Sequence, residues 1–239
     1  MENINILQKK YIKGLFKGAV ADFKKNWKLL ILIQLFLVIA QLVIAGVAES
    51  SDMFAFMLAL IFNFLSLGAF FVLLKVIDEK EISFSQLWNS VTFKQYITYL
   101  FANILVTLMV LGGLILLIVP GIILAVASTY TLYAVLDKKK GITESIQYSF
   151  KITKGHRLRI FTTLLVMGLF SLIGILALGV GILVTSLIAA LVYVRMYREL
   201  ATVYEGNTEV NTLSESADST TEVDSQESSS EGQDDMDKK

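Results

Sequence analysis

The chain has 239 residues, of which 55% are hydrophobic and 18% are charged, with a mean hydropathy of +0.65 and no cysteine. Soluble domains carry about a quarter charged residues, so this composition argues against a soluble globular class. The missing cysteines exclude disulfides and thiolate metal sites. The formal net charge of zero averages two opposite regions, because residues 1–204 carry +9 and residues 205–239 carry −9.

The first 28 residues predict an amphipathic helix at a membrane surface. Apolar side chains recur at helical spacing from Ile4 to Trp27, and the seven lysines of this segment lie mostly off that stripe. A helix of this kind lies in the headgroup region with its apolar face toward the acyl chains. We therefore assign residues 1–28 to a cytoplasmic amphipathic helix.

Long uncharged runs after this segment predict six membrane-spanning helices. A spanning helix needs about 20 apolar residues, and the runs 97–136 and 160–194 are each long enough for two. Pro120-Gly121 and the glycines at 179–181 predict a turn in the middle of each run. The expected spans are 29–48, 53–76, 97–118, 121–137, 159–178 and 181–199, so that residues 29–204 form an all-α, polytopic membrane domain.

The spans are expected to form three hairpins, each preceded by an amphipathic interfacial helix. The second interfacial helix is predicted over 83–96, where Ser83 and Gln86 have the spacing of a capping box. The third lies within 136–155. A shift of 60 residues superposes several residues of the second unit on the third, which indicates a repeat.

The basic residues indicate the orientation. All 19 Lys and Arg residues before the acidic tail fall on one side of the six-span arrangement, and the positive-inside rule places that side in the cytoplasm. We expect a bacterial cytoplasmic membrane protein with both termini cytoplasmic.

Basic side chains at this face attract anionic lipid by about 1 kcal/mol each. The candidate headgroup contacts are Lys138, Lys139, Lys140, Lys151, Arg157 and Arg159. Nucleic acid is not an expected partner, because topology already accounts for these charges.

Residues 205–239 are rich in Ser, Thr, Asp and Glu and contain no aromatic residue. Such a segment cannot bury enough surface to offset its chain entropy, which predicts a disordered acidic cytoplasmic tail. A solvating role is favoured over a partner-binding or phosphorylated segment.

Catalytic and metal-binding patterns are missing from the sequence. The single histidine, His156, lies beside Arg157 and Arg159 and is interpreted as an interfacial residue rather than a base. The interiors of the predicted spans contain no charged residue, whereas proton and ion pathways usually reveal themselves by an intramembrane charge. We expect no enzyme activity, no cofactor and no metal site.

Neutral polar side chains do occur within the spans. The candidate intramembrane polar contacts are Gln34, Gln41, Asn63 and Asn103. Hydrogen bonds between helices, each worth about 1 kcal/mol, are the favoured interpretation. The alternative is a polar groove for a lipid headgroup or a small solute, which would make the protein a transporter or permease subunit for lipid or a small amphipathic solute.

The stretch "LLIVPGIILAVASTYTLYAVLDKKKGITESIQYSFKITKG" resembles the signature of an uncharacterised bacterial family of multi-pass membrane proteins. That family is related to the membrane domain of glycerophosphoryl diester phosphodiesterase. The residues that carry the resemblance are Pro120, Gly121, Ile122, Asp137, Gly141, Glu144, Ser145, Ser149, Thr153, Lys154 and Gly155. The resemblance covers roughly residues 10–204 and implies the fold. Phosphodiesterase activity is not implied, because the chain has no hydrolase domain.

These residues also predict an elbow between two spans. Asp137 ends the fourth span, Thr143 is expected to cap a short helix with Glu144 in its first turn, and Gly155 is expected to end that helix at C′. The leading hypothesis is a structural or accessory module without catalytic activity. We expect it to contact lipid, a membrane-protein partner or a second copy of the chain.

Overall fold

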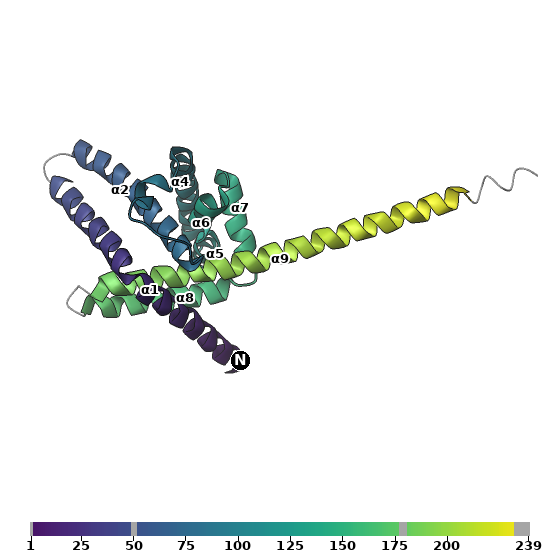
Figure 1. Cartoon of the computed structure of the whole chain (residues 1–239), viewed down its shortest axis with the longest axis horizontal. Coiled ribbons are helices and arrows are strands. Elements are labelled where there is room, and N and C mark those ends of the chain that lie inside the picture. The colour runs from purple at the N-terminus through teal and green to yellow at the C-terminus, as the bar shows by residue number, and fades with distance from the viewer. Residues whose placement is uncertain (1, 49–51, 177–180, 232–239) are drawn as a thin grey trace, which may run out of the picture. The chain divides into compact units, whose positions relative to one another are not determined.

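The computed structural model describes residues 2–48, 52–176 and 181–231, and within these ranges every regular element is a helix (Figure 1). The helices are α1 (Glu2–Ala48), α2 (Asp52–Ile77), α3 (Gln86–Asn89), α4 (Phe93–Leu116), α5 (Ile118–Ser128), α6 (Thr131–Lys138), α7 (Ile142–Thr153), α8 (Arg157–Leu176) and α9 (Gly181–Glu231). The chain divides into two compact units, Met1–Arg198 and Glu199–Lys239.

Six helical segments within the described ranges are long and apolar enough to cross a membrane. They are Lys10–Val47, Asp52–Ile77, Phe93–Leu116, Ile118–Lys138, Arg157–Gly174 and Gly181–Glu209. Each of them overlaps one predicted span. The all-helical class and the number of candidate spans are therefore confirmed.

α1 differs from its prediction because the amphipathic segment and the first span form one continuous helix. Leu15 and Ala19 of the predicted apolar stripe are buried within the first unit. Next to them, the ring of Phe16 meets Phe170 of α8 edge-on, with the ring centres 5.2 Å apart. This part of the stripe thus packs on protein where the sequence predicts acyl chains, whereas Trp27 of the same stripe is exposed. No proline interrupts residues 2–48, so nothing stops the helix at the expected boundary.

The predicted second interfacial helix is also different in the structure. It shrinks to the four residues of α3, and a new helix begins at Phe93. The capping box forms at Thr92 and Gln95, where the Thr92 N–H donates to Gln95 Oε1 at 2.9 Å, and the prediction of Ser83 with Gln86 is wrong. Leu87 of α3 is fully buried, and a Cβ at Gly68 of α2 would overlap its backbone. This close approach fixes α3 against α2.

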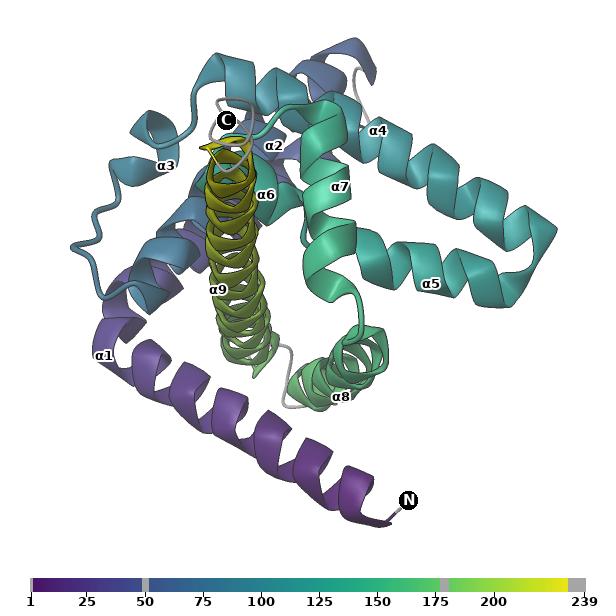
Figure 2. The same cartoon turned by 90° about the vertical axis from the view of Figure 1, so that its right-hand side faces the viewer.

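α4 and α5 lie side by side and antiparallel (Figure 2). The chain reverses at Leu117, which is extended at φ −159° and ψ 138°, three residues before the predicted Pro120-Gly121 turn. Pro120 instead lies in the first turn of α5, where a missing N–H costs no helical bond. Gly121 packs against α4, because a Cβ there would lie 2.7 Å from the Leu114 nitrogen.

The fourth candidate span is broken in a place that the sequence does not predict. α5 ends at Ser128 and α6 begins at Thr131. The bond from the Thr129 N–H to the Val126 carbonyl tightens the last turn, and Tyr130 leaves helical geometry at ψ 9°. The predicted turn at 179–181 lies almost wholly outside the described residues.

α9 continues as a helix to Glu231. Residues 205–231 are therefore helical where the sequence predicts disorder, and residues 232–239 lie outside the described part of the chain. A helix satisfies its own backbone hydrogen bonds and can extend without a partner. Ser, Thr and Asp have modest helix propensity, however, so the disorder of this segment in water stays a prediction.

Candidate functional site

The most concentrated polar cluster of the first unit is centred on Arg198 of α9. Its guanidinium donates from Nη2 to Asp78 Oδ2 at 2.6 Å and from Nη1 to Asp137 Oδ2 at 2.7 Å. Asp78 follows the last residue of α2, and Asp137 lies in the last turn of α6. The three side chains are between 16% and 23% exposed, so the charges are only partly solvated. We call this arrangement the Asp78–Arg198–Asp137 bridge.

A tyrosine cluster lies directly beside the bridge. The Tyr197 hydroxyl donates to Asp137 Oδ2 at 2.9 Å. Its ring stacks on Tyr133 of α6 with a centre-to-centre distance of 5.1 Å, and Tyr130 lies 5.8 Å from both rings. All three rings are buried. Aromatic pairs of this kind add about 0.5–1.5 kcal/mol beyond their buried area, so the cluster holds α6 against α9.

A second ion pair ties α1 to α9. Arg195 donates from Nε and Nη2 to Asp22 Oδ2, each at 2.6 Å. Gly18 makes room for this guanidinium, since a Cβ there would lie 2.7 Å from Arg195 Nη1. The pair fixes the N-terminal half of α1 on the same helix that carries the bridge.

The elbow residues of the family-like stretch begin with the cap of α7. The N-cap is Gly141, whose N–H donates to Glu144 Oε2 at 3.3 Å. The prediction of Thr143 as N-cap is wrong, because Lys139 adopts a left-handed conformation at φ 51° and turns the chain earlier. Gly155 has φ 82° and lies just after the C-cap residue Lys154, as the elbow prediction required.

Three hydroxyl side chains of the same stretch lie on one face of α7. Ser145, Ser149 and Thr153 are spaced four residues apart and are fully buried. Ser149 Oγ donates to the Ala127 carbonyl at 2.7 Å and accepts from the Tyr130 N–H at 3.1 Å. These are backbone groups at the break between α5 and α6. Backbone N–H and C=O groups without a hydrogen-bond partner are costly in a membrane. Ser149 therefore stabilises the break, because its hydroxyl bonds two of these groups.

Thr153 and Ser145 complete this row. Thr153 Oγ1 donates to the Ser149 carbonyl at 2.8 Å and lies 3.5 Å from the Ala127 carbonyl. Ser145 Oγ donates to the Gly141 carbonyl at 2.6 Å. The row therefore bonds backbone carbonyls rather than facing a cavity, and its chemistry is that of a brace between α7 and the α5–α6 break.

The candidate headgroup contacts are only partly directed outward. Lys139 and Lys151 are exposed, whereas Lys138 lies 3.9 Å from Asp137. The remaining three lie over aromatic rings: Lys140 is 5.2 Å from Tyr148, Arg157 is 5.9 Å from Phe150, and Arg159 is 4.6 Å from Tyr11 of α1. Cation–π contacts of this kind stabilise the fold and leave part of each cation available at the surface.

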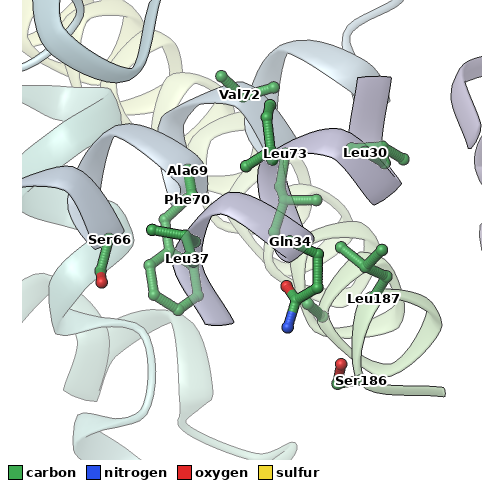
Figure 3. A pocket seen from close by; sticks show the side chains of 12 residues that line it. Leu30, Gln34, Leu37, Ser66, Ala69, Phe70, Val72, Leu73, Ser186 and Leu187 are labelled. Atoms are coloured by element: carbon green, nitrogen blue, oxygen red, sulfur yellow. The ribbon is translucent and has the colours of Figure 1, made fainter. Parts of the chain in front are cut away.

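The candidate intramembrane polar residues do not line one groove. Gln41 and Asn103 are exposed on α1 and α4, and Asn103 donates to its neighbour Tyr99 at 3.1 Å. Asn63 is half-buried on α2. Gln34 lines a cavity between α1, α2 and α9, together with Ser66 and Ser186 (Figure 3).

Within the described ranges, no group of three or more His, Asp or Glu side chains could hold a metal ion. No family model matches the chain, and neither a curated protein nor a solved structure matches it.

Of the residues that form the bridge and the α1–α9 pair, the sequence analysis singles out only Asp137. Asp78 stands in the charged run 78–81, and the two arginines belong to the 19 basic residues that indicate the orientation. Two patterns could have revealed them. Asp22 is the only acidic residue between Glu2 and Glu49, and Arg195 and Arg198 are three residues apart, so that they lie on neighbouring turns of one helix.

Proposed function

We propose that the protein is a six-span membrane protein with both termini cytoplasmic, acting as a non-catalytic structural or accessory module that contacts lipid or a membrane partner. The observation that carries the proposal is the Asp78–Arg198–Asp137 bridge. Asp78 follows the second candidate span, Asp137 lies at the C-terminal end of the fourth, and Arg198 lies in the sixth, after its uncharged part. Side chains in contact must share one side of a membrane, so an even number of crossings separates each of them from the next.

The pair of Asp22 with Arg195 supports the same topology. It joins a residue that precedes the apolar part of α1 to one near the end of the last apolar stretch. All six crossings would lie between these two residues. With the lysines concentrated at this end, the positive-inside rule makes it the cytoplasmic end, in three hairpins whose tips face the opposite side.

The non-catalytic role is supported by how the polar residues are used. Asp137 is bound to Arg198 and Tyr197, and Ser149 and Thr153 are bound to backbone carbonyls. Such groups hold helices in place, and a general base needs a free proton acceptor near a substrate. The family resemblance, to proteins with a membrane domain of this kind, agrees with a module that serves another protein or the bilayer.

A transporter or permease subunit is the alternative, and it requires a polar path along the spans. Gln41 and Asn103 are exposed on separate helices, whereas Gln34 lines a cavity. The accessory module is therefore the better supported of the two functions.

Complementation of a deletion strain tests the non-catalytic role. We expect His156→Ala, Glu144→Gln and Asp137→Asn to restore the phenotype in proportion to the amount of protein in the membrane, because none of these groups performs chemistry. Immunoblotting of the membrane fraction gives that amount. Lost complementation by a variant present at the wild-type level would overturn the proposal.

A further inference from the structure

The cavity between α1, α2 and α9 has a volume of about 240 Å³ and lies wholly within the candidate spans. Its walls are mainly aliphatic and aromatic, including Leu30, Ile33, Leu37, Phe70 and Leu73. No charged side chain lines it. An apolar cavity of roughly 150 Å³ accommodates benzene, so this one has room for on the order of ten carbon atoms.

The side chain of Gln34 extends from α1 into this space (Figure 3). Its amide has two N–H donors and an acceptor oxygen, and it has no hydrogen-bond partner among the described residues. Ser66 and Ser186 also line the cavity, and their hydroxyls donate to Phe62 and Leu183 of their own helices at 2.9 and 3.2 Å. The serines are thus satisfied as donors, whereas the Gln34 amide faces an apolar space with its donors unused.

The position of Gln34 fits a particular part of a lipid. It lies six residues after Lys28, which is about 9 Å along a helix axis at 1.5 Å per residue. The hydrocarbon core is about 30 Å thick, so Gln34 would lie in the cytoplasmic leaflet, within reach of the upper part of a lipid. A second hollow of about 300 Å³ follows along the same two helices, lined by Phe36, Ala40 and Val43 of α1 and by Leu58 and Phe62 of α2.

We propose that this cavity binds one acyl chain of a membrane lipid, and that Gln34 Nε2 donates to the ester carbonyl of that chain. The inference rests on the proposed membrane placement. An ionised group is unsuited to the cavity because no charged residue would pair with it. A protein helix is about 10 Å across and too wide for this space. A flexible chain fits the apolar walls and brings the acceptor that Gln34 lacks.

Photocrosslinking of the full chain in nanodiscs tests the site. The probes are a phosphatidylethanolamine with a diazirine on one acyl chain and a free fatty acid with the same diazirine. We expect labelled peptides from the cavity walls, within residues 30–37, 66–73 and 186–190. Labelling of these peptides by the phospholipid probe supports the site. Labelling by the fatty acid alone would contradict it, because the cavity has no charged residue to pair with a carboxylate.

Two variants of α1 provide a matched pair. Gln34→Leu keeps the side-chain size and removes the donor, and we expect it to lower cavity labelling about fivefold, the effect of losing a hydrogen bond of about 1 kcal/mol in a membrane. Gln41→Leu makes the same change on an exposed face of α1 and is expected to leave the labelling unchanged. Ala69→Phe fills the cavity and is expected to lower the labelling as well.

Equal labelling of the Gln34→Leu and Gln41→Leu variants would overturn the proposal, as would wild-type labels spread evenly over the exposed faces of α1 and α4. Thermal unfolding in detergent confirms that each variant is folded. Single cysteines at Ser83 and Leu117 report the topology separately, in intact cells. If they lie on opposite sides while the cavity stays unlabelled, the acyl-chain site fails and the membrane placement stands.

Discussion

Arg198 is a residue on which distant parts of the first unit converge. It bonds two aspartates that lie 59 residues apart in the sequence and that end different helices. Charge-assisted hydrogen bonds of this length are about twice as strong as neutral ones. Tyr197 adds a hydroxyl to the same carboxylate. Because the three charged groups are only partly exposed, each depends on the others for its solvation.

Removing one member of the bridge should destabilise the protein. We expect Arg198→Gln to lower the free energy of unfolding by about 1–3 kcal/mol, less than a fully buried pair because water reaches the site. Asp137→Asn should have an effect of similar size. The double variant should lose less unfolding free energy than the sum of the two single-variant losses, as measured by a double-mutant cycle in detergent. Strict additivity would show that the two side chains do not interact.

Ser149 makes a separate prediction at the same scale. Ser149→Ala leaves the Tyr130 N–H without the hydroxyl that it donates to, and we expect a loss of about 1–3 kcal/mol in unfolding free energy. Ser171→Ala is the control, because the Ser171 hydroxyl bonds only the Met167 carbonyl of its own helix. Thermal unfolding of both variants measures the difference, and equal midpoints would contradict the brace.

At the scale of elements, the helices are held by small residues where backbones approach and by polar residues where helices end. Gly68 admits the backbone at Leu87, and Gly121 lets α5 approach α4. Membrane helices use small residues in this way because packing, rather than the hydrophobic effect, drives their association. The breaks at Leu117 and Tyr130 then set the directions of α5 and α6.

The α4–α5 contact can be tested with two glycines of the same hairpin. Gly121→Ala would push its Cβ into Leu114 of α4, and we expect a loss of about 1–3 kcal/mol from overpacking. Gly112→Ala has open space around its Cβ, and it should be neutral or stabilise the helix by up to about 1 kcal/mol. The unfolding midpoint of Gly121→Ala should therefore lie clearly below that of Gly112→Ala. A stable Gly121→Ala variant would show that the hairpin is loosely packed.

At the scale of the whole molecule, the first unit is organised by the end that carries its ion pairs. The bridge, the tyrosine cluster and the Asp22–Arg195 pair join α1, α2, α6 and α9 there. Away from this end, many apolar side chains are exposed, such as Ile115, Leu116 and Ile118 at the α4–α5 tip. Exposed apolar surface of this extent is what a bilayer would cover.

Single cysteines test this arrangement, and the chain has no native cysteine to remove. Ser83→Cys lies between α2 and α3, and Leu117→Cys lies at the α4–α5 tip. We expect a membrane-impermeant maleimide to label only Leu117→Cys in intact cells with an accessible outer face of the membrane, and both variants after permeabilisation. Labelling of Ser83→Cys before permeabilisation would reverse the proposed orientation.

By itself, the sequence determined the all-helical class, the six candidate spans and the end of α7 at Gly155. These depend on the hydropathy of a window and on the conformational limits of single residues, which are local. It could not determine that α1 runs unbroken, that the fourth span breaks at Tyr130, or that Arg198 joins Asp78 to Asp137. Each of these depends on which helices meet, because a hydroxyl from α7 supports the break and an arginine from α9 compensates two distant carboxylates. Only the tertiary structure brings those partners together.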